Sequence, residues 1–238
     1  MSESALPVIK VCCIASVEEA RVAIAAGAHA LGLVSAMPSG PGVIGDDRIA
    51  EIAAEVAAEG AATGAPVQTF LLTSRQTAAG IIEQHRRCRT TTLQLVDHVA
   101  LDELARLRDA LPAVRLVQVI HVTGEASLDE AVEVAPWVDA ILLDSGNPAA
   151  AVKELGGTGR VHDWRSSRRI RDAVHPLPLF LAGGLSADNV AEAIRTVQPL
   201  GLDLCSSVRR DGRLDAERLG AFMAAVRRTA RPSKGIER

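Results

Sequence analysis

Short apolar runs rich in Val, Ile and Leu alternate with longer segments of helical period along the chain, and this alternation constrains the fold more than any other feature. The short runs are predicted as strands: Val8–Ile14, Ala30–Val34, Pro66–Leu72, Thr91–Leu95, Val114–Val122, Val138–Asp144, Leu177–Ala182 and Gly201–Cys205. The longer segments are predicted as helices: Ser16–Ala26, Asp46–Glu59, Ser74–Arg87, Leu101–Leu111, Glu125–Ala135, Asp163–Val174, Ser186–Val197 and Leu214–Arg228. Regular alternation of strand and helix indicates a parallel sheet, and eight such units predict a closed (β/α)8 barrel.

The residues at the segment ends support this division. Ser16 and Glu19 form a capping box at the start of the first helix, and Gly27 follows its end. An open doubly wound sheet is the alternative, but no GxGxxG motif follows the first strand. A chain of 238 residues suits one barrel, so residues 1–238 are predicted to form a single catalytic domain.

Composition excludes several classes of partner. Aromatic residues make up 2% of the chain, Tyr is absent and the formal net charge is −3, so neither stacking platforms nor a basic surface for nucleic acid is present. No apolar run approaches the roughly 20 residues that span a bilayer, and the amino terminus has no signal-peptide pattern. The cysteines, at positions 12, 13, 88 and 205, lack zinc-type spacing. We therefore expect a cytoplasmic protein that binds no nucleic acid, membrane or metal.

Candidate catalytic residues follow the first and sixth predicted strands. In (β/α)8 barrels, chemistry lies at the carboxyl ends of the strands and in the loops after them. The first strand carries Cys12 and Cys13 near its end, and the sixth ends in Asp144. The thiolate of Cys12 could accept a proton, and Asp144 would place a carboxylate at the barrel mouth. A core role for Cys12 and a loop-capping role for Asp144 are the alternatives.

Glycine and serine clusters follow the last three strands. They are Gly156-Gly157-Thr158-Gly159, Gly183-Gly184 and Cys205-Ser206-Ser207. Barrels often hold a phosphate here, through backbone N–H groups that glycine lets approach the anion. Any one cluster is also explained by a simple turn. Together they predict a phosphate site.

The motifs at these positions resemble those of the phosphoribosylanthranilate isomerase family. The first strand reads Ile9-Lys10-Val11-Cys12-Cys13-Ile14, where the family has V-K-I-C-G-I. The family patterns L-L-L-D-S, G-G-T-G-x-x-F-D-W and D-V-S-S-G-V-E are matched by residues 141–145, 156–164 and 203–209. The resemblance spans nearly the whole chain and is most specific in its carboxyl-terminal half.

The resemblance implies an Amadori rearrangement in tryptophan biosynthesis. N-(5′-phosphoribosyl)anthranilate would become 1-(o-carboxyphenylamino)-1-deoxyribulose 5-phosphate, with Cys12 as general base on the sugar C2 proton and Asp144 as general acid on the ring oxygen. It implies this sugar phosphate as the only ligand, no cofactor, and a monomer or homodimer. The expected phosphate- and substrate-binding residues are Lys10, Gln94, His121, Gly157, Thr158, Gly159, Gly183, Gly184, Cys205, Ser206 and Ser207. Strand alternation places Cys12 and Cys13 on opposite faces, and the resemblance assigns Cys12 to the interior.

Several positions depart from the family pattern. Cys13 replaces a glycine, and Gly40-Pro41-Gly42 replaces S-P-R, whose Arg would pair with the anthranilate carboxylate. Other departures are Val96-Asp97 for H-G, His121 for Arg and Ser207 for Gly. The missing Arg leaves open a divergent isomerase, or a non-catalytic binder, for another phosphorylated aminosugar. A metal-dependent epimerase is a further alternative, for which only His121 and the Asp97-His98 pair come near as ligands.

Overall fold

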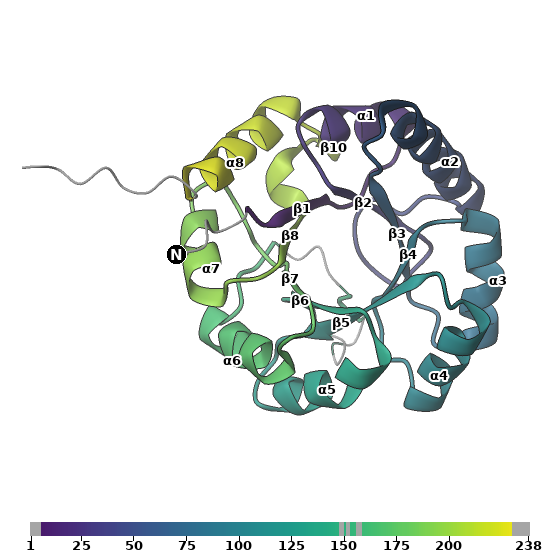
Figure 1. Cartoon of the computed structure of the whole chain (residues 1–238). Coiled ribbons are helices and arrows are strands. Elements are labelled where there is room, and N and C mark those ends of the chain that lie inside the picture. Colours follow the sequence, from purple (N-terminus) through teal and green to yellow (C-terminus); the bar gives the residue numbers. More distant parts are fainter. Residues whose placement is uncertain (1–5, 148–149, 151–152, 156–158, 230–238) are drawn as a thin grey trace, which may run out of the picture.

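The computed structural model describes residues 6–147, 150, 153–155 and 159–229, in which eight parallel strands close into a barrel (Figure 1). The strands are β1 (Val8–Val11), β2 (Ala30–Val34), β3 (Gln68–Thr73), β4 (Thr92–Leu95), β5 (Arg115–His121), β6 (Ala140–Asp144), β7 (Leu179–Leu181) and β8 (Gly201–Leu204). Because β1 pairs with both β2 and β8, the sheet has no free edge. The predicted (β/α)8 class is confirmed.

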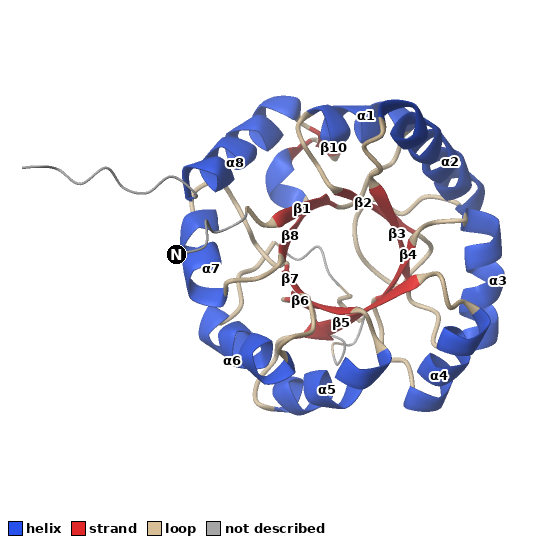
Figure 2. Ribbon diagram, viewed as in Figure 1, coloured by secondary structure: helices blue, strands red, loops and turns tan. Residues whose placement is uncertain are grey.

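A ring of helices surrounds the barrel (Figure 2). The helices are α1 (Val17–Ala25), α2 (Asp46–Thr63), α3 (Ala78–Cys88), α4 (Leu101–Ala110), α5 (Ala126–Val134), α6 (Trp164–Val174), α7 (Val190–Val197) and α8 (Ala216–Thr229), with 3-10 turns η1 (Ala135–Trp137) and η2 (Ser206–Val208). Ser16 caps α1 as predicted, its hydroxyl accepting from the Glu19 N–H at 3.2 Å. Among the described residues, no helix has the length and apolar character needed to cross a membrane.

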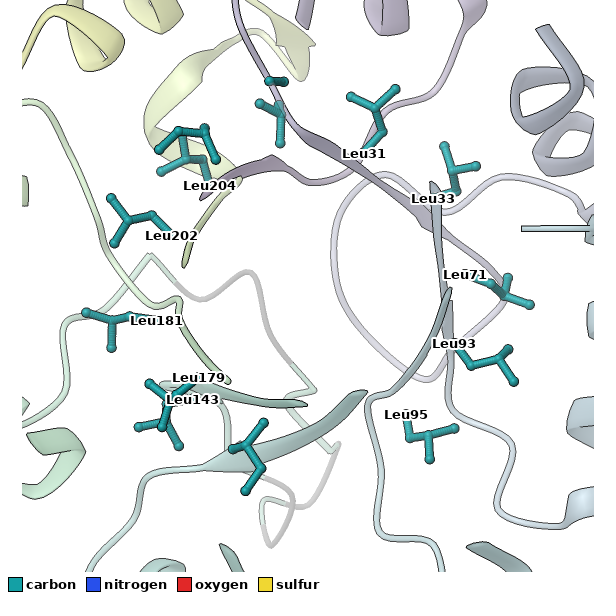
Figure 3. Close-up of a cluster of buried hydrophobic side chains, with 14 of the residues drawn as sticks. Leu31, Leu33, Leu71, Leu93, Leu95, Leu143, Leu179, Leu181, Leu202 and Leu204 are labelled. Atoms are coloured by element: carbon teal, nitrogen blue, oxygen red, sulfur yellow. The ribbon is translucent and has the colours of Figure 1, made fainter. Parts of the chain in front are cut away.

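The core has two layers because side chains of a strand point alternately outward and inward. The outward layer packs against the helices, and Figure 3 shows its leucines around the strand ring, among them Leu31, Leu93 and Leu181. The inward layer includes Phe70 and Phe180, whose rings meet edge to face with centroids 6.2 Å apart. Their rings take up interior space, and a cavity opens at the carboxyl ends of the strands.

Several boundaries differ from the sequence predictions. β1 ends at Val11 rather than Ile14, because Cys13 has φ 63°, a left-handed conformation that a strand cannot contain. α3 begins at Ala78 rather than Ser74, because the Thr77 side chain caps it by accepting from the Gly80 N–H. α2 continues to Thr63 instead of ending at Glu59. β2 has the predicted bounds, and the remaining strands and helices differ by up to a few residues at their ends.

A short hairpin before α8 was not predicted. It pairs β9 (Arg209–Arg210) with β10 (Arg213–Leu214) through Asp211 and Gly212, which have φ of 51° and 77°. An Asp-Gly pair with two positive φ values favours such a two-residue turn. This dipeptide is therefore the signal in the sequence that could have identified the hairpin.

Candidate active site

A cavity of about 660 Å³, its open mouth included, lies at the carboxyl ends of the strands. The predicted site residues that line it are Cys12, Gln94, Asp144, Gly159, Gly183, Gly184, Cys205 and Ser206. Lys10, His121 and Ser207 are outside its lining, while Gly157 and Thr158 lie outside the described residues.

Cys12 and Asp144 reach this cavity from different sides of the barrel. Cys12 follows β1 and is 6% exposed, whereas Asp144 ends β6 and is 8% exposed. One carboxylate oxygen of Asp144 accepts a hydrogen bond from the Ser145 N–H at 2.7 Å. A thiol and a carboxyl group on two walls of one cavity can act on two different atoms of a bound molecule.

A buried ion pair lies beside Cys12. Lys10 Nζ donates to Asp203 Oδ2 at 2.8 Å across the β1–β8 pairing. Burial acts to lower the pKa of Lys10, but Asp203 and Cys12 outweigh it and raise that pKa. Burial raises the pKa of Asp203 in spite of Lys10. Asp203 lines the cavity, and its Oδ1 has no hydrogen-bond partner within the described residues, so it can accept one from a ligand.

Gly32 makes room for these groups. A Cβ atom at Gly32 would lie 2.8 Å from Cys12 Sγ and 3.0 Å from Lys10 Nζ. Any larger residue would therefore displace the thiol or the ammonium group.

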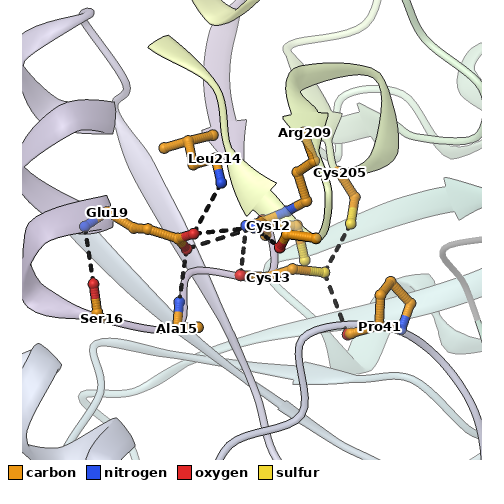
Figure 4. A network of polar contacts seen from close by, with 10 residues as sticks. Cys12, Cys13, Ala15, Ser16, Glu19, Pro41, Cys205, Arg209 and Leu214 are labelled. Atoms are coloured by element: carbon orange, nitrogen blue, oxygen red, sulfur yellow. Dashed lines mark hydrogen bonds and ion pairs between the residues drawn. The ribbon is translucent and has the colours of Figure 1, made fainter.

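The prediction that Cys12 and Cys13 point to opposite faces is wrong, because both line the cavity. Alternation holds only inside a strand, and β1 has already ended at Val11. The left-handed backbone at Cys13 turns its thiol toward Cys205, with the two Sγ atoms 2.8 Å apart (Figure 4). The Pro41 carbonyl oxygen, 3.5 Å from Cys13 Sγ, is an alternative acceptor for the single S–H of Cys13.

Arg209 is a buried residue of the site that sequence reasoning missed. Its guanidinium donates to the carbonyls of Cys12, at 3.0 Å, and Cys13 (Figure 4). It also contacts Glu19 Oε1 at 3.3 Å, and Glu19 in turn accepts from the Leu214 N–H at 2.9 Å. Arg209 therefore ties the end of β1 to the hairpin. The sequence feature that could have identified it is its position in residues 203–209, where the family pattern D-V-S-S-G-V-E ends in Glu and this chain has Arg.

The paired glycines after β7 are explained by both conformation and space. Gly183 and Gly184 have φ of 81° and 62°, which favour glycine. A Cβ atom at Gly184 would lie 2.7 Å from the Arg160 carbonyl carbon, and one at Gly183 would lie 3.0 Å from Ser145 Oγ. The loops after β6 and β7 thus approach each other closely at the cavity rim.

His121, which is buried, and Ser207, which is half-buried, lie outside the cavity lining. The ring of His121 is hydrogen-bonded through Nε2 to the Val96 carbonyl at 3.0 Å. A Cβ atom at Gly146 would lie 2.4 Å from His121 Nδ1, so the ring packs beneath the loop after β6. The Ser207 hydroxyl is buried without a hydrogen-bond partner in the described part of the chain.

The described residues contain no group of three or more His, Cys, Asp or Glu side chains that could hold a metal ion. The Asp97 carboxylate instead forms an ion pair with Lys153, whose Nζ lies 2.6 Å from Oδ2. Oδ1 of Asp97 accepts from the His98 N–H at 2.9 Å. The carboxylate of Asp97, one of the ligands that an epimerase would need, thus has another local role.

Comparison with known proteins places the chain among its relatives. A family model described as N-(5′-phosphoribosyl)anthranilate (PRA) isomerase matches residues 10–225. The N-(5′-phosphoribosyl)anthranilate isomerase of Haloferax volcanii is 37% identical over 225 residues, covering 94% of each chain. That of Methanocella arvoryzae is 32% identical over 222 residues, covering 93% of this chain and 98% of the relative.

The chain belongs to the N-(5′-phosphoribosyl)anthranilate isomerase family. Solved structures share its fold. Phosphoribosyl anthranilate isomerase from Thermotoga maritima matches with a TM-score of 0.76 at 23% identity, covering 93% of this chain and 99% of that one. A structure of a phosphoribosyl anthranilate isomerase in complex with reduced 1-(o-carboxyphenylamino)-1-deoxyribulose 5-phosphate matches with a TM-score of 0.74 at 21% identity, covering 93% of this chain and 99% of that one.

Two departures from the family pattern are in contact. Gly42 stands where the family pattern has Arg, and Cys13 stands where it has Gly. A Cβ atom at Gly42 would lie 2.5 Å from the Cβ of Cys13. The Cys13 side chain therefore occupies space that a side chain at position 42 would need, and the two substitutions compensate each other sterically.

Proposed function

We propose that this chain is an N-(5′-phosphoribosyl)anthranilate isomerase of tryptophan biosynthesis that converts its substrate to 1-(o-carboxyphenylamino)-1-deoxyribulose 5-phosphate. The observation that carries the proposal is that Cys12 and Asp144 line one cavity in a chain of this family. The family relationship across residues 10–225 supplies the reaction, and the cavity supplies an acid and a base for it.

In this proposal, Asp144 protonates the ring oxygen of the aminoaldose, and the C1–O bond breaks to give an iminium ion. Cys12 then removes the C2 proton, and the electron pair of that C–H bond neutralises the iminium to give an enolamine. Tautomerisation of the enolamine yields the ketose. Each proton transfer contributes about 10²–10⁴-fold to the rate, and no cofactor takes part.

Other cavity groups are proposed to orient the sugar phosphate. Gly183, Gly184 and Ser206 lie at the rim, where backbone N–H groups can hold a phosphate. The Oε1 of Gln94 and the Oδ1 of Asp203 are buried and have no partner among the described residues, so they can accept from ribose hydroxyls. Lys10 is proposed to act through Asp203. His121 and Ser207 do not line the cavity, so either could contact the substrate only if the loops at the carboxyl ends of the strands rearranged.

The proposal is tested with purified protein and phosphoribosylanthranilate, whose fluorescence falls as it is consumed. We expect turnover by the wild type and complementation of a tryptophan auxotroph that lacks this isomerase. Asp144→Asn and Cys12→Ser should each lose about 10²–10⁴-fold in kcat while retaining affinity for inorganic phosphate. A folded, phosphate-binding wild type without turnover would contradict the proposal.

The cellular setting belongs to the same proposal. We propose a cytoplasmic enzyme in which the whole chain forms one catalytic domain and acts as a monomer or homodimer on a small-molecule substrate. Sedimentation of the purified chain distinguishes the two oligomeric states. A larger assembly would contradict this part of the proposal and leave the reaction untouched.

A further inference from the structure

Two thiols meet at the wall of the cavity. Cys13 and Cys205 are 192 residues apart in sequence, yet their Sγ atoms lie 2.8 Å apart (Figure 4). Both side chains line the cavity, Cys13 as a buried residue and Cys205 as a half-buried one. At these positions the family pattern has Gly and Ser, so the thiol pair is a property of this chain. The catalytic proposal uses neither thiol as acid or base.

The fold places this pair at some cost. The φ of 63° at Cys13 is a conformation that costs a residue other than glycine about 1–2 kcal/mol. The side chain of Cys13 fits only because residue 42 is glycine: a Cβ atom at position 42 would overlap the Cys13 side chain. Retaining a side chain at such a position suggests that the thiol itself has a use.

The neighbouring groups shift the pKa values of the two thiols in opposite directions, so that Cys205 is the nucleophile and Cys13 is the proton donor. A hydrogen bond from Cys13 and the positive charge of Arg209 lower the pKa of Cys205 against the effect of burial. The neighbouring thiols of Cys12 and Cys205, together with burial, raise the pKa of Cys13. Cys205 is therefore the member of the pair that reacts as a thiolate.

We propose that Cys13 and Cys205 are a modification site for small-molecule disulfides, at which they form a reversible intramolecular disulfide bond. The Cys205 thiolate attacks one sulfur of the oxidant, the S–S bond of the oxidant breaks, and one thiolate leaves. Cys13 then gives up its proton and attacks Cys205 Sγ, which expels the second thiolate. Two protein thiols are oxidised by two electrons, the oxidant is reduced to two thiols, and the released protons end on those thiols.

The required movement is small and its consequence is local. The sulfurs must approach by roughly 0.8 Å to reach the covalent S–S length of about 2.05 Å. This shift pulls the segment after β1, which contains Cys12, toward the η2 turn, which begins at Ser206. Since misplacement of about 1 Å can cost on the order of 10²-fold in rate, the disulfide is expected to reduce turnover 10- to 100-fold or so.

The test counts thiols in the full-length protein. Reduced protein is incubated with oxidised glutathione, denatured and alkylated with iodoacetamide. All four cysteines are free in the structure, and we expect alkylated thiols to fall from four to two. Trypsin, which cleaves after Lys and Arg, should then release residues 11–21 joined to residues 196–209. Dithiothreitol should restore the four thiols, together with any lost turnover.

Matched variants identify the partners. Cys12→Ser should still form the cross-link, whereas Cys13→Gly should stop at a mixed disulfide of glutathione with Cys205. Cys88→Ala, which removes a buried thiol of α3, should keep the pair. Absence of the cross-linked peptide from the wild type would overturn the proposal, as would a cross-link that persists in Cys13→Gly. The thiol count is independent of catalysis, so it decides the question even if the proposed isomerase activity is absent.

Discussion

At the scale of single residues, the site depends on where small groups leave space for reactive ones. Gly32 leaves room for Cys12 Sγ and Lys10 Nζ, and Gly42 leaves room for Cys13. In a close-packed interior, one added carbon at such a position must displace its neighbour. Glycine is therefore required at positions 32 and 42 because of the neighbouring side chains, and not only because of backbone conformation.

The contact between Gly42 and Cys13 predicts coupled substitutions. Gly42→Arg alone should destabilise the protein by about 2 kcal/mol or more, because its Cβ would overlap that of Cys13. Adding Cys13→Gly should recover part of this loss and lower KM for phosphoribosylanthranilate through a new Arg–carboxylate contact. Urea unfolding of both single variants and the double variant gives the coupling energy. Additive effects would mean that the two sites are independent.

The thiol of Cys205 should react at lower pH than an ordinary cysteine. Because its pKa is lowered, its thiolate persists below the usual value of about 8.5, and the alkylation rate should fall only as pH drops through the lowered pKa. Cys88 is an internal control, since burial raises its pKa to about 12. Iodoacetamide labelling followed by mass spectrometry at several pH values measures both. Equal pH profiles at the two positions would contradict the assignment.

At the scale of elements, the hairpin of β9 and β10 anchors the loop that carries Cys12 and Cys13. Arg209 of β9 contacts the carbonyls of Cys12 and Cys13 and the carboxylate of Glu19. A guanidinium can hold several acceptors at once because its donors have a fixed planar geometry. The position of Cys12 is thus set partly by an element that lies almost two hundred residues later in the chain.

Removing this anchor should affect both stability and catalysis. Arg209→Ala should cost about 3 kcal/mol, because the carboxylate of Glu19 would lose its cation. It should also lower kcat more than it raises KM, since Cys12 is no longer positioned. Arg210→Ala on the same strand is the control and should cost under about 1 kcal/mol, because the Arg210 side chain is 58% exposed. An unchanged kcat in a folded Arg209→Ala protein would leave Arg209 with a structural role only.

At the scale of the whole molecule, the barrel closes where the first strand meets the last. The β1–β8 seam carries the buried ion pair between Lys10 and Asp203. The Lys10 side chain is fully buried and that of Asp203 is 7% exposed, so each charge depends on the other. The Lys10–Asp203 ion pair therefore joins the two strands that close the barrel, and its Asp203 side places a carboxylate in the cavity lining.

A double-mutant cycle tests this dependence. Lys10→Met should destabilise the protein by about 3–5 kcal/mol, because it leaves the Asp203 carboxylate buried without a cation. Lys10→Met combined with Asp203→Leu should regain most of that loss. Thermal and urea unfolding of the four proteins provide the values. A double variant as unstable as the sum of the single variants would show that the pair is not coupled.

The order of apolar periods along the chain was enough to predict the (β/α)8 fold, because such periods are local properties and need no knowledge of distant contacts. It also placed Cys12 and Asp144 at strand ends, which a barrel brings to one rim. Three features became visible only in the folded chain: β1 ends before Cys13, Cys13 turns toward Cys205, and Arg209 binds the carbonyls of Cys12 and Cys13. These contacts join residues more than 190 positions apart, and they exist because ring closure brings the first and last strands together.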